Sequence, residues 1–144
     1  MTPSQVFSYV GMIAMPMWLL MIFLPQRKVT KFLMDYKVVP LVLVLVYAVY
    51  IIKGIVLFGM MDFGSLASFM DFFTKENTVL ASWVHYLAFD LLVGMWMIDQ
   101  NKNVGIHQVL MAPCLLATFL FGPLGFFCLQ FYKLLKNKHY ESDQ

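Results

Sequence analysis

The sequence predicts an all-α integral membrane protein, a bundle of four transmembrane helices with an interfacial segment between the second helix and the third. Hydrophobic residues make up 61% of the 144 residues and charged residues only 12%, a balance far from that of soluble domains. The apolar residues gather into four runs, each long enough at about 1.5 Å per residue to cross a hydrocarbon core about 30 Å thick. Neither a repeat nor a polar linker divides the sequence, so a single domain over residues 1–144 is expected.

The four spans are expected at about residues 6–24, 38–60, 79–98 and 104–132. The first and the fourth lack Asp, Glu, Lys and Arg, whereas the second contains Lys53 and the third contains Asp90. The basic connection 25–37 is expected to lie along the lipid headgroups. In the connection 61–78, apolar residues recur at helical spacing, which predicts an amphipathic turn or two at the interface. These residues are Phe63, Leu66, Met70 and Phe73.

The basic residues form two clusters whose positions conflict with four crossings. The first cluster lies between spans one and two, and the second follows span four. Their members are Arg27, Lys28, Lys31 and Lys37, and then Lys133, Lys136 and Lys138. The positive-inside rule favours the cytoplasm for both clusters, but four full crossings would put them on opposite faces. One solution is that Gly122-Pro123-Leu124-Gly125 breaks the last segment and makes it a re-entrant or kinked element.

An aspartate lies in the middle of the third span, in the stretch WVHYLAFDLLVGMW. An aspartate at the centre of a membrane helix costs about 2.5–3.5 kcal/mol. Asp90 is therefore expected to face the protein interior and to be paired, protonated or hydrated. Helical spacing places Tyr86 and Trp83 on its face and His85 about 140° round the helix, from where His85 and Asp90 could still border one cavity.

Three hypotheses account for this polar group: an acid/base catalytic site, a structural clamp between helices, and a proton or ion path. Lys53 is expected at a depth from which it either reaches Asp90 or extends towards the headgroups. Metal binding is not expected, because one histidine and one aspartate five residues apart lack the usual ligand cluster. The sequence also lacks a phosphate-binding glycine loop and a nucleic-acid-binding face, so neither a cofactor nor a nucleic-acid partner is expected.

Four stretches carry a resemblance to a known family: PMWLLMIFLP (16–25), GSLASFM (64–70), VLASWVHYLAFDLLVGMW (79–96) and PCLLATFLFGPLGF (113–126). Together they resemble the ABA4-like family of small integral membrane proteins. The most specific part is the W-x-H…D core of Trp83, His85 and Asp90, and the FGPLG of the fourth stretch supports it. The chain departs from the family near positions 95 and 96, where an arginine is frequent in the family and this chain has Met95 and Trp96.

The family is named for a plant chloroplast protein that is required to make neoxanthin from violaxanthin. That protein looks like an isomerase that opens a carotenoid epoxide into an allene. Such a reaction needs an acid for the epoxide oxygen and a base for a proton of the chain. The resemblance implies that Asp90, His85 and Tyr86 would take these catalytic parts.

We therefore expect a membrane-embedded protein that binds a carotenoid or related isoprenoid and isomerises it by acid/base catalysis. The ligand is expected to contact Lys53, Trp83, Trp18 and Phe89. The partners would be this apolar molecule and membrane lipids, and the location a bacterial inner membrane, since the chain lacks a transit peptide. Two alternatives stay open: a non-catalytic pigment-binding or assembly protein, and a small proton-coupled carrier, which would have to form a homo-oligomer.

Overall fold

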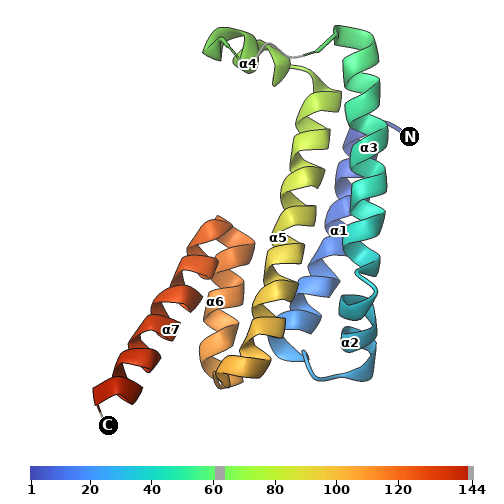
Figure 1. Cartoon of the computed structure of the whole chain (residues 1–144). Coiled ribbons are helices and arrows are strands. Elements are labelled where there is room, and N and C mark those ends of the chain that lie inside the picture. Colours follow the sequence, from blue (N-terminus) through green and yellow to red (C-terminus); the bar gives the residue numbers. More distant parts are fainter. Residues whose placement is uncertain (61–63, 143–144) are drawn as a thin grey trace. The chain divides into compact units, whose positions relative to one another are not determined.

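The computed structural model describes residues 1–60 and 64–142, with side chains up to residue 135. Throughout these residues the regular structure is helical, which confirms the predicted all-α class (Figure 1). The helices are α1 (Pro3–Phe23), α2 (Lys28–Asp35), α3 (Val38–Phe58), α4 (Leu66–Phe72), α5 (Glu76–Val104), α6 (Gln108–Phe121) and α7 (Pro123–Ser142).

Three helices, and not the expected four, are long and apolar enough to cross a membrane in the described part of the chain. They are α1, α3 and α5, with mean hydropathies of 1.9, 2.6 and 1.4. They fit an integral membrane protein, and their positions agree with the first three expected spans. The fourth span, expected at 104–132, is wrong, because this segment is divided between α6 and α7. With 14 residues, α6 extends only about 21 Å.

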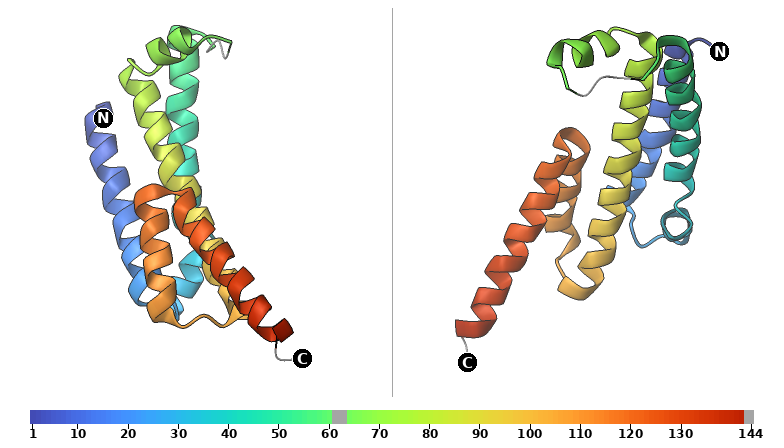
Figure 2. Two further views of the ribbon diagram at one scale, coloured as in Figure 1. Left: turned by 90° about the vertical axis from the view of Figure 1, so that its left-hand side faces the viewer. Right: turned by 45° about the horizontal axis from the view of Figure 1, so that its top comes forward.

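The division follows from the sequence FGPLG. Gly122 has φ 58° and ψ −105°, a left-handed backbone that residues with a side chain rarely adopt. Pro123 begins α7, and proline is favoured at the first helical position, where its missing N–H leaves no hydrogen bond unmade. The chain therefore reverses, and α6 and α7 lie antiparallel and side by side (Figures 1 and 2). The alternative of a broken last segment is thus confirmed.

Gly125 makes the close approach of α6 and α7 possible. A Cβ atom at Gly125 would overlap the backbone oxygen of Cys114 and the backbone nitrogen and hydroxyl group of Thr118. The Thr118 hydroxyl group is fully buried and donates to the Cys114 oxygen at 3.0 Å. Small residues at such contacts let helix backbones touch in membrane proteins. We name the α6–α7 pair the hairpin.

The chain forms two compact units, each with its own internal packing. The first unit contains residues 1–15 and 37–89, and the second contains 16–36 and 90–144. The helices α1 and α5 are continuous and contribute one part to each unit. Pro16, inside α1, is the first residue of the second unit.

In the first unit, α3 lies antiparallel to the beginning of α5. Three contacts set the register: Tyr47 with His85 (ring centroids 5.4 Å apart), Gly54 with Thr78 (a Cβ 3.7 Å from Oγ1), and Phe58 with the Lys75 ammonium group (5.7 Å from the ring centroid). The residue number rises along α5 as it falls along α3, as an antiparallel pair requires. The register places Lys53 beside Val79. Between the two helices, α4 confirms the helix predicted in the connection 61–78, although Phe63 lies outside the described residues.

In the second unit, the basic segments meet at one end. The Gln108 side chain donates to the backbone oxygen of Ile22 at 2.7 Å, which joins the start of α6 to the end of α1. Lys133 of α7 lies 3.3 Å from the side-chain oxygen of Gln100 and over the Trp96 ring. The α1–α2 connection, the end of α5 and Lys133 are therefore neighbours.

This arrangement removes the conflict between the two basic clusters. If α1, α3 and α5 each cross the membrane, the α1–α3 connection and the end of α5 lie on the same face, and the hairpin brings the chain back towards that face. Lys133 then shares a face with Arg27, Lys28 and Lys31, as the positive-inside rule favours. The side chains of Lys136 and Lys138 lie outside the described part.

The packing at Gly94 of α5 supports a first prediction. A Cβ atom there would lie 2.9 Å from Cη2 of Trp18 and 2.8 Å from Cε of Met21. The methionine end can move, but the indole ring is rigid and only 1% exposed. Gly94→Ala is expected to lower the free energy of unfolding by about 1–3 kcal/mol. Unfolding by dodecyl sulfate in mixed micelles measures this change.

Gly11→Ala is the matched control, because a Cβ at Gly11 of α1 would meet nothing within 4 Å. That variant is expected to be as stable as the parent or slightly more stable, since alanine favours the helix. Equal stabilities of the two variants would contradict the contact between α1 and α5 in the second unit.

Candidate functional site

Asp90 of α5 is buried, with only 8% of its surface exposed. The expectation that this residue faces protein is confirmed. Its burial follows from the helical stripe to which it belongs, since Leu87, Leu91 and Gly94 are buried at neighbouring positions of the same helix. Protein atoms therefore cover most of this residue.

Trp18 of α1 belongs to the core of the second unit. It is 1% exposed, and its ring lies 5.4 Å from that of Phe119 in α6. Among the residues that the structure describes, its buried indole N–H has no hydrogen-bond partner. Trp18 therefore packs against α5 and α6, and its expected contact with a ligand stays a prediction.

Two rows of aromatic side chains include residues of the first half of α5, and both lie inside the first unit. The first row is Phe7, Trp83 and Tyr86, with successive centroid distances of 5.5 and 5.8 Å. The second row is Tyr47, His85 and Phe89, with distances of 5.4 and 4.5 Å. Trp83 is 38% exposed and Phe89 is 55% exposed. In a membrane, both rows would present ring surface to the lipid or to an apolar ligand.

The structure places His85 and Asp90 on different sides of α5. His85 is exposed and its ring is tilted against those of Tyr47 and Phe89, whereas Asp90 is buried. Five residues on a helix correspond to a rotation of about 140°. Tyr86, half-buried and four residues before Asp90, shares the face of the carboxylate. Of the expected groups, Tyr86 is therefore better placed than His85 to act with Asp90.

Lys53 of α3 is exposed, and its ammonium group lies 5.2 Å from the centroid of the Tyr50 ring. Its neighbour on α5 is Val79, which precedes Asp90 by about 16 Å along the helix axis. A lysine side chain reaches about 6 Å. This register does not support contact with Asp90, and the ammonium group lies over the ring of Tyr50, one turn earlier in α3, rather than towards the end of the helix at Phe58.

A group of polar residues at the basic end of the second unit is not predicted by the sequence pattern. A cavity of about 320 Å³ there is lined by Gln26, Lys31, Asn101 and Lys102, among others. A second cavity, of about 290 Å³, lies in the first unit beside Phe7 and Leu80. Neither cavity is lined by His85, Tyr86 or Asp90. The basic cluster in 25–37 was the available signal for the first cavity, but its partners come from a distant part of the chain.

The fold fits a small helical membrane protein whose longest helix, α5, carries a buried carboxylate. A family model described as ABA4-like (ABA DEFICIENT 4-like) matches residues 5–129. The chain belongs to this family, which confirms the resemblance seen in the W-x-H…D core and in FGPLG. No curated protein and no solved structure matches the chain.

Proposed function

We propose that the protein binds a carotenoid or a related isoprenoid within the membrane and rearranges it by acid/base catalysis. The observation that carries this proposal is the burial of Asp90, within a span and one turn after Tyr86, on the helix that carries both aromatic rows. Membership of the ABA4-like family adds a relation to neoxanthin synthesis. An ionisable residue inside a membrane helix is costly, and such residues commonly serve function.

The proposed reaction is an isomerisation that needs no oxidant and no second substrate. An acid protonates the oxygen of a strained epoxide, and the C–O bond breaks with its electrons going to that oxygen. A base then removes a proton from the adjacent carbon of the polyene, and the released electron pair forms the allene. Atoms and charge balance, because one proton is given and one is taken. Asp90 with Tyr86 is the proposed proton donor and acceptor.

His85 is the further acid/base candidate, and its contacts suggest how it takes part. Its ring lies against those of Tyr47 and Phe89, tilted to both, in the second aromatic row, on the other side of α5 from the carboxylate. A long polyene that lies across α5 could meet His85 and Tyr86 at different carbons. Flat conjugated molecules are well held by aromatic rings, so Trp83 and Phe89 are the proposed binding surface.

One observation favours a second candidate, a protein that binds pigment without changing it. His85 and Asp90 point about 140° apart, so one epoxide cannot lie next to both side chains. If Tyr86 does not replace His85 as the partner of Asp90, only the binding surface is left. Pigment profiles of cells with and without the protein separate the two candidates, because catalysis changes the ratio of two pigments whereas binding changes only their amounts.

Trp83→Ala tests the binding surface. Loss of a stacked ring is expected to weaken pigment binding about 2- to 10-fold, the equivalent of about 0.5–1.5 kcal/mol. The visible absorbance of the purified protein, relative to its protein absorbance, measures the bound pigment. Trp96→Ala is the matched control, since Trp96 is 39% exposed and its ring lies in the second unit, tilted against that of Phe126. Equal pigment loss in both variants would overturn the assignment of the first aromatic row.

A further inference from the structure

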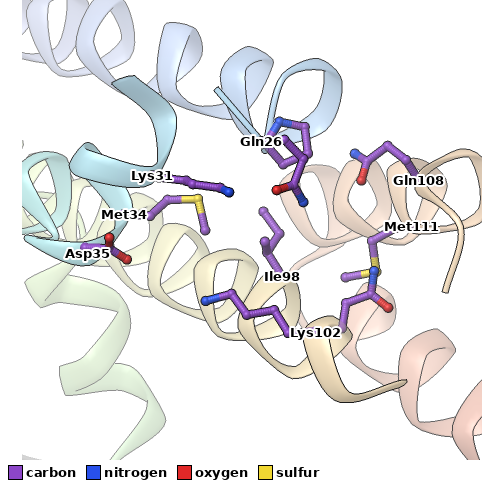
Figure 3. Close-up of a pocket in the computed structure, with 10 residues that line it drawn as sticks. Gln26, Lys31, Met34, Asp35, Ile98, Lys102, Gln108 and Met111 are labelled. Atoms are coloured by element: carbon purple, nitrogen blue, oxygen red, sulfur yellow. The ribbon is translucent and has the colours of Figure 1, made fainter. Parts of the chain in front are cut away.

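The cavity at the basic end of the second unit has the layout of an interfacial binding site. Its volume is about 320 Å³. Met34, Ile98 and Met111 supply an apolar part, while Gln26, Lys31 and Lys102 supply polar and charged groups (Figure 3). A site of this kind suits a ligand with one polar, charged end and one apolar end.

The polar groups of the cavity differ in their availability. Asn101 is engaged, because its side chain bonds both the N–H and the C=O of Ile106 at 2.8 Å. Gln108 is engaged with the backbone of α1. By contrast, within the described residues the Lys31 ammonium group and the Gln26 amide group make no hydrogen bond, and Figure 3 shows the Lys31 side chain extended towards Gln26.

The charge around the cavity favours an anion. Lys102 pairs with Asp99 at 2.6 Å, but both side chains are 63% exposed, so this pair is weak and can be shared with a ligand. Asp35 also lines the cavity, yet Figure 3 places its carboxylate on the far side of Met34 from Gln26. Arg27 and Lys28 follow Gln26 directly in the sequence.

The depth of the cavity indicates where the ligand comes from. Its lining residues lie after the end of α1, in and before α2, near the end of α5 and at the start of α6. These are ends of membrane-crossing helices, where lipid headgroups lie. By the positive-inside rule this face is the cytoplasmic one, and basic pockets between membrane helices on that side bind anionic headgroups.

We propose that this cavity binds a phosphate group, supplied by the headgroup of an anionic phospholipid. Lys31 and Gln26 donate to the phosphate oxygens, and Lys102 faces the same group from α5. The acyl chains of the lipid extend out of the cavity alongside Met34 and Met111. Soluble phosphate has the same chemistry, so the experiment must separate the two sources. The site is independent of the aromatic rows and of Asp90.

Native mass spectrometry of the detergent-purified full chain tests the proposal. Protein is mixed with phosphatidylglycerol or with phosphatidylcholine, and the fraction that retains one lipid is measured. Phosphatidylglycerol is expected to be retained about tenfold better, and Lys31→Gln is expected to remove most of this preference, since a charge-assisted hydrogen bond is lost. Lys28→Gln makes the same charge change on α2 at a residue outside the cavity lining, and it is expected to keep the preference.

Inorganic phosphate in millimolar excess forms the second arm. If it binds without lipid and Lys31→Gln abolishes that binding, the site takes phosphate from solution. Retention of both lipids to the same extent overturns the proposal, and so does a Lys31→Gln variant that behaves like Lys28→Gln. Because Lys31 is exposed, its replacement is expected to leave the fold intact, and equal helical circular dichroism of the variants verifies this.

Discussion

Gly125→Ala is expected to open the hairpin and to lower the free energy of unfolding by about 3 kcal/mol, the upper end for an overpacked site. The added methyl group would overlap backbone atoms of α6 at Cys114 and Thr118. Backbone atoms cannot move aside as the end of a flexible side chain can, so α7 must shift as a whole. Unfolding by dodecyl sulfate, followed by circular dichroism, measures the loss.

Leu124→Ala is the control for this prediction. Leu124 precedes Gly125 in the same turn of α7, and 54% of its surface is exposed. In a membrane this side chain would face lipid, so its truncation is expected to change the stability by less than about 1 kcal/mol. If Gly125→Ala proved as stable as Leu124→Ala, the close packing of α6 against α7 would be wrong.

Asp90→Asn is expected to reduce product formation by a factor of about 10² to 10⁴, the usual contribution of a positioned acid or base. Asparagine has nearly the same size and stays hydrogen-bonding, but it cannot give and retake a proton. The fold and the bound pigment are therefore expected to persist. Chromatography of the pigments from cells that express the parent or the variant measures the product.

Asp99→Asn on the same helix is the matched control, since the side chain of Asp99 is 63% exposed and lies outside the proposed site. This variant is expected to form product at the parental rate. Loss of pigment together with product in Asp90→Asn would instead assign Asp90 a binding or structural role. An Asp90→Leu variant that still folds and still forms product would end the catalytic proposal.

Hydropathy along the chain was sufficient to predict α1, α3 and α5. Exposing polar backbone groups to lipid is costly, and a long apolar segment avoids this cost by forming a helix, which satisfies its backbone hydrogen bonds internally. The same measure failed for 104–132. It counts apolar residues but does not register that Gly122 takes up a left-handed conformation, after which the chain reverses. The glycine and proline residues of FGPLG are the sequence signal for this reversal, and hydropathy does not detect them.

For the candidate site, the sequence was sufficient to predict which side chain is buried, because solvation energy determines burial. It was not sufficient to predict which residues of α3 and α5 lie at the same height, because that depends on the register of the two helices. Asp90 had to be buried because of its charge, and the 140° offset of His85 follows from helical geometry alone. Which residue of α5 lies beside Lys53 depends on where α5 begins. The helix begins at Glu76, earlier than the hydropathy of 79–98 indicated. The cavity beside Lys31 unites two segments far apart in sequence, which no local pattern reveals.

The reversal at Gly122 has a consequence for how the protein is made. A fourth crossing would require the insertion machinery to carry Lys133 and its basic neighbours through the bilayer, against both hydration energy and the membrane potential. A hairpin that enters the bilayer and returns to the same face would transfer only apolar side chains out of water. With such a topology the last lysines would stay on the side of the membrane on which they are synthesised.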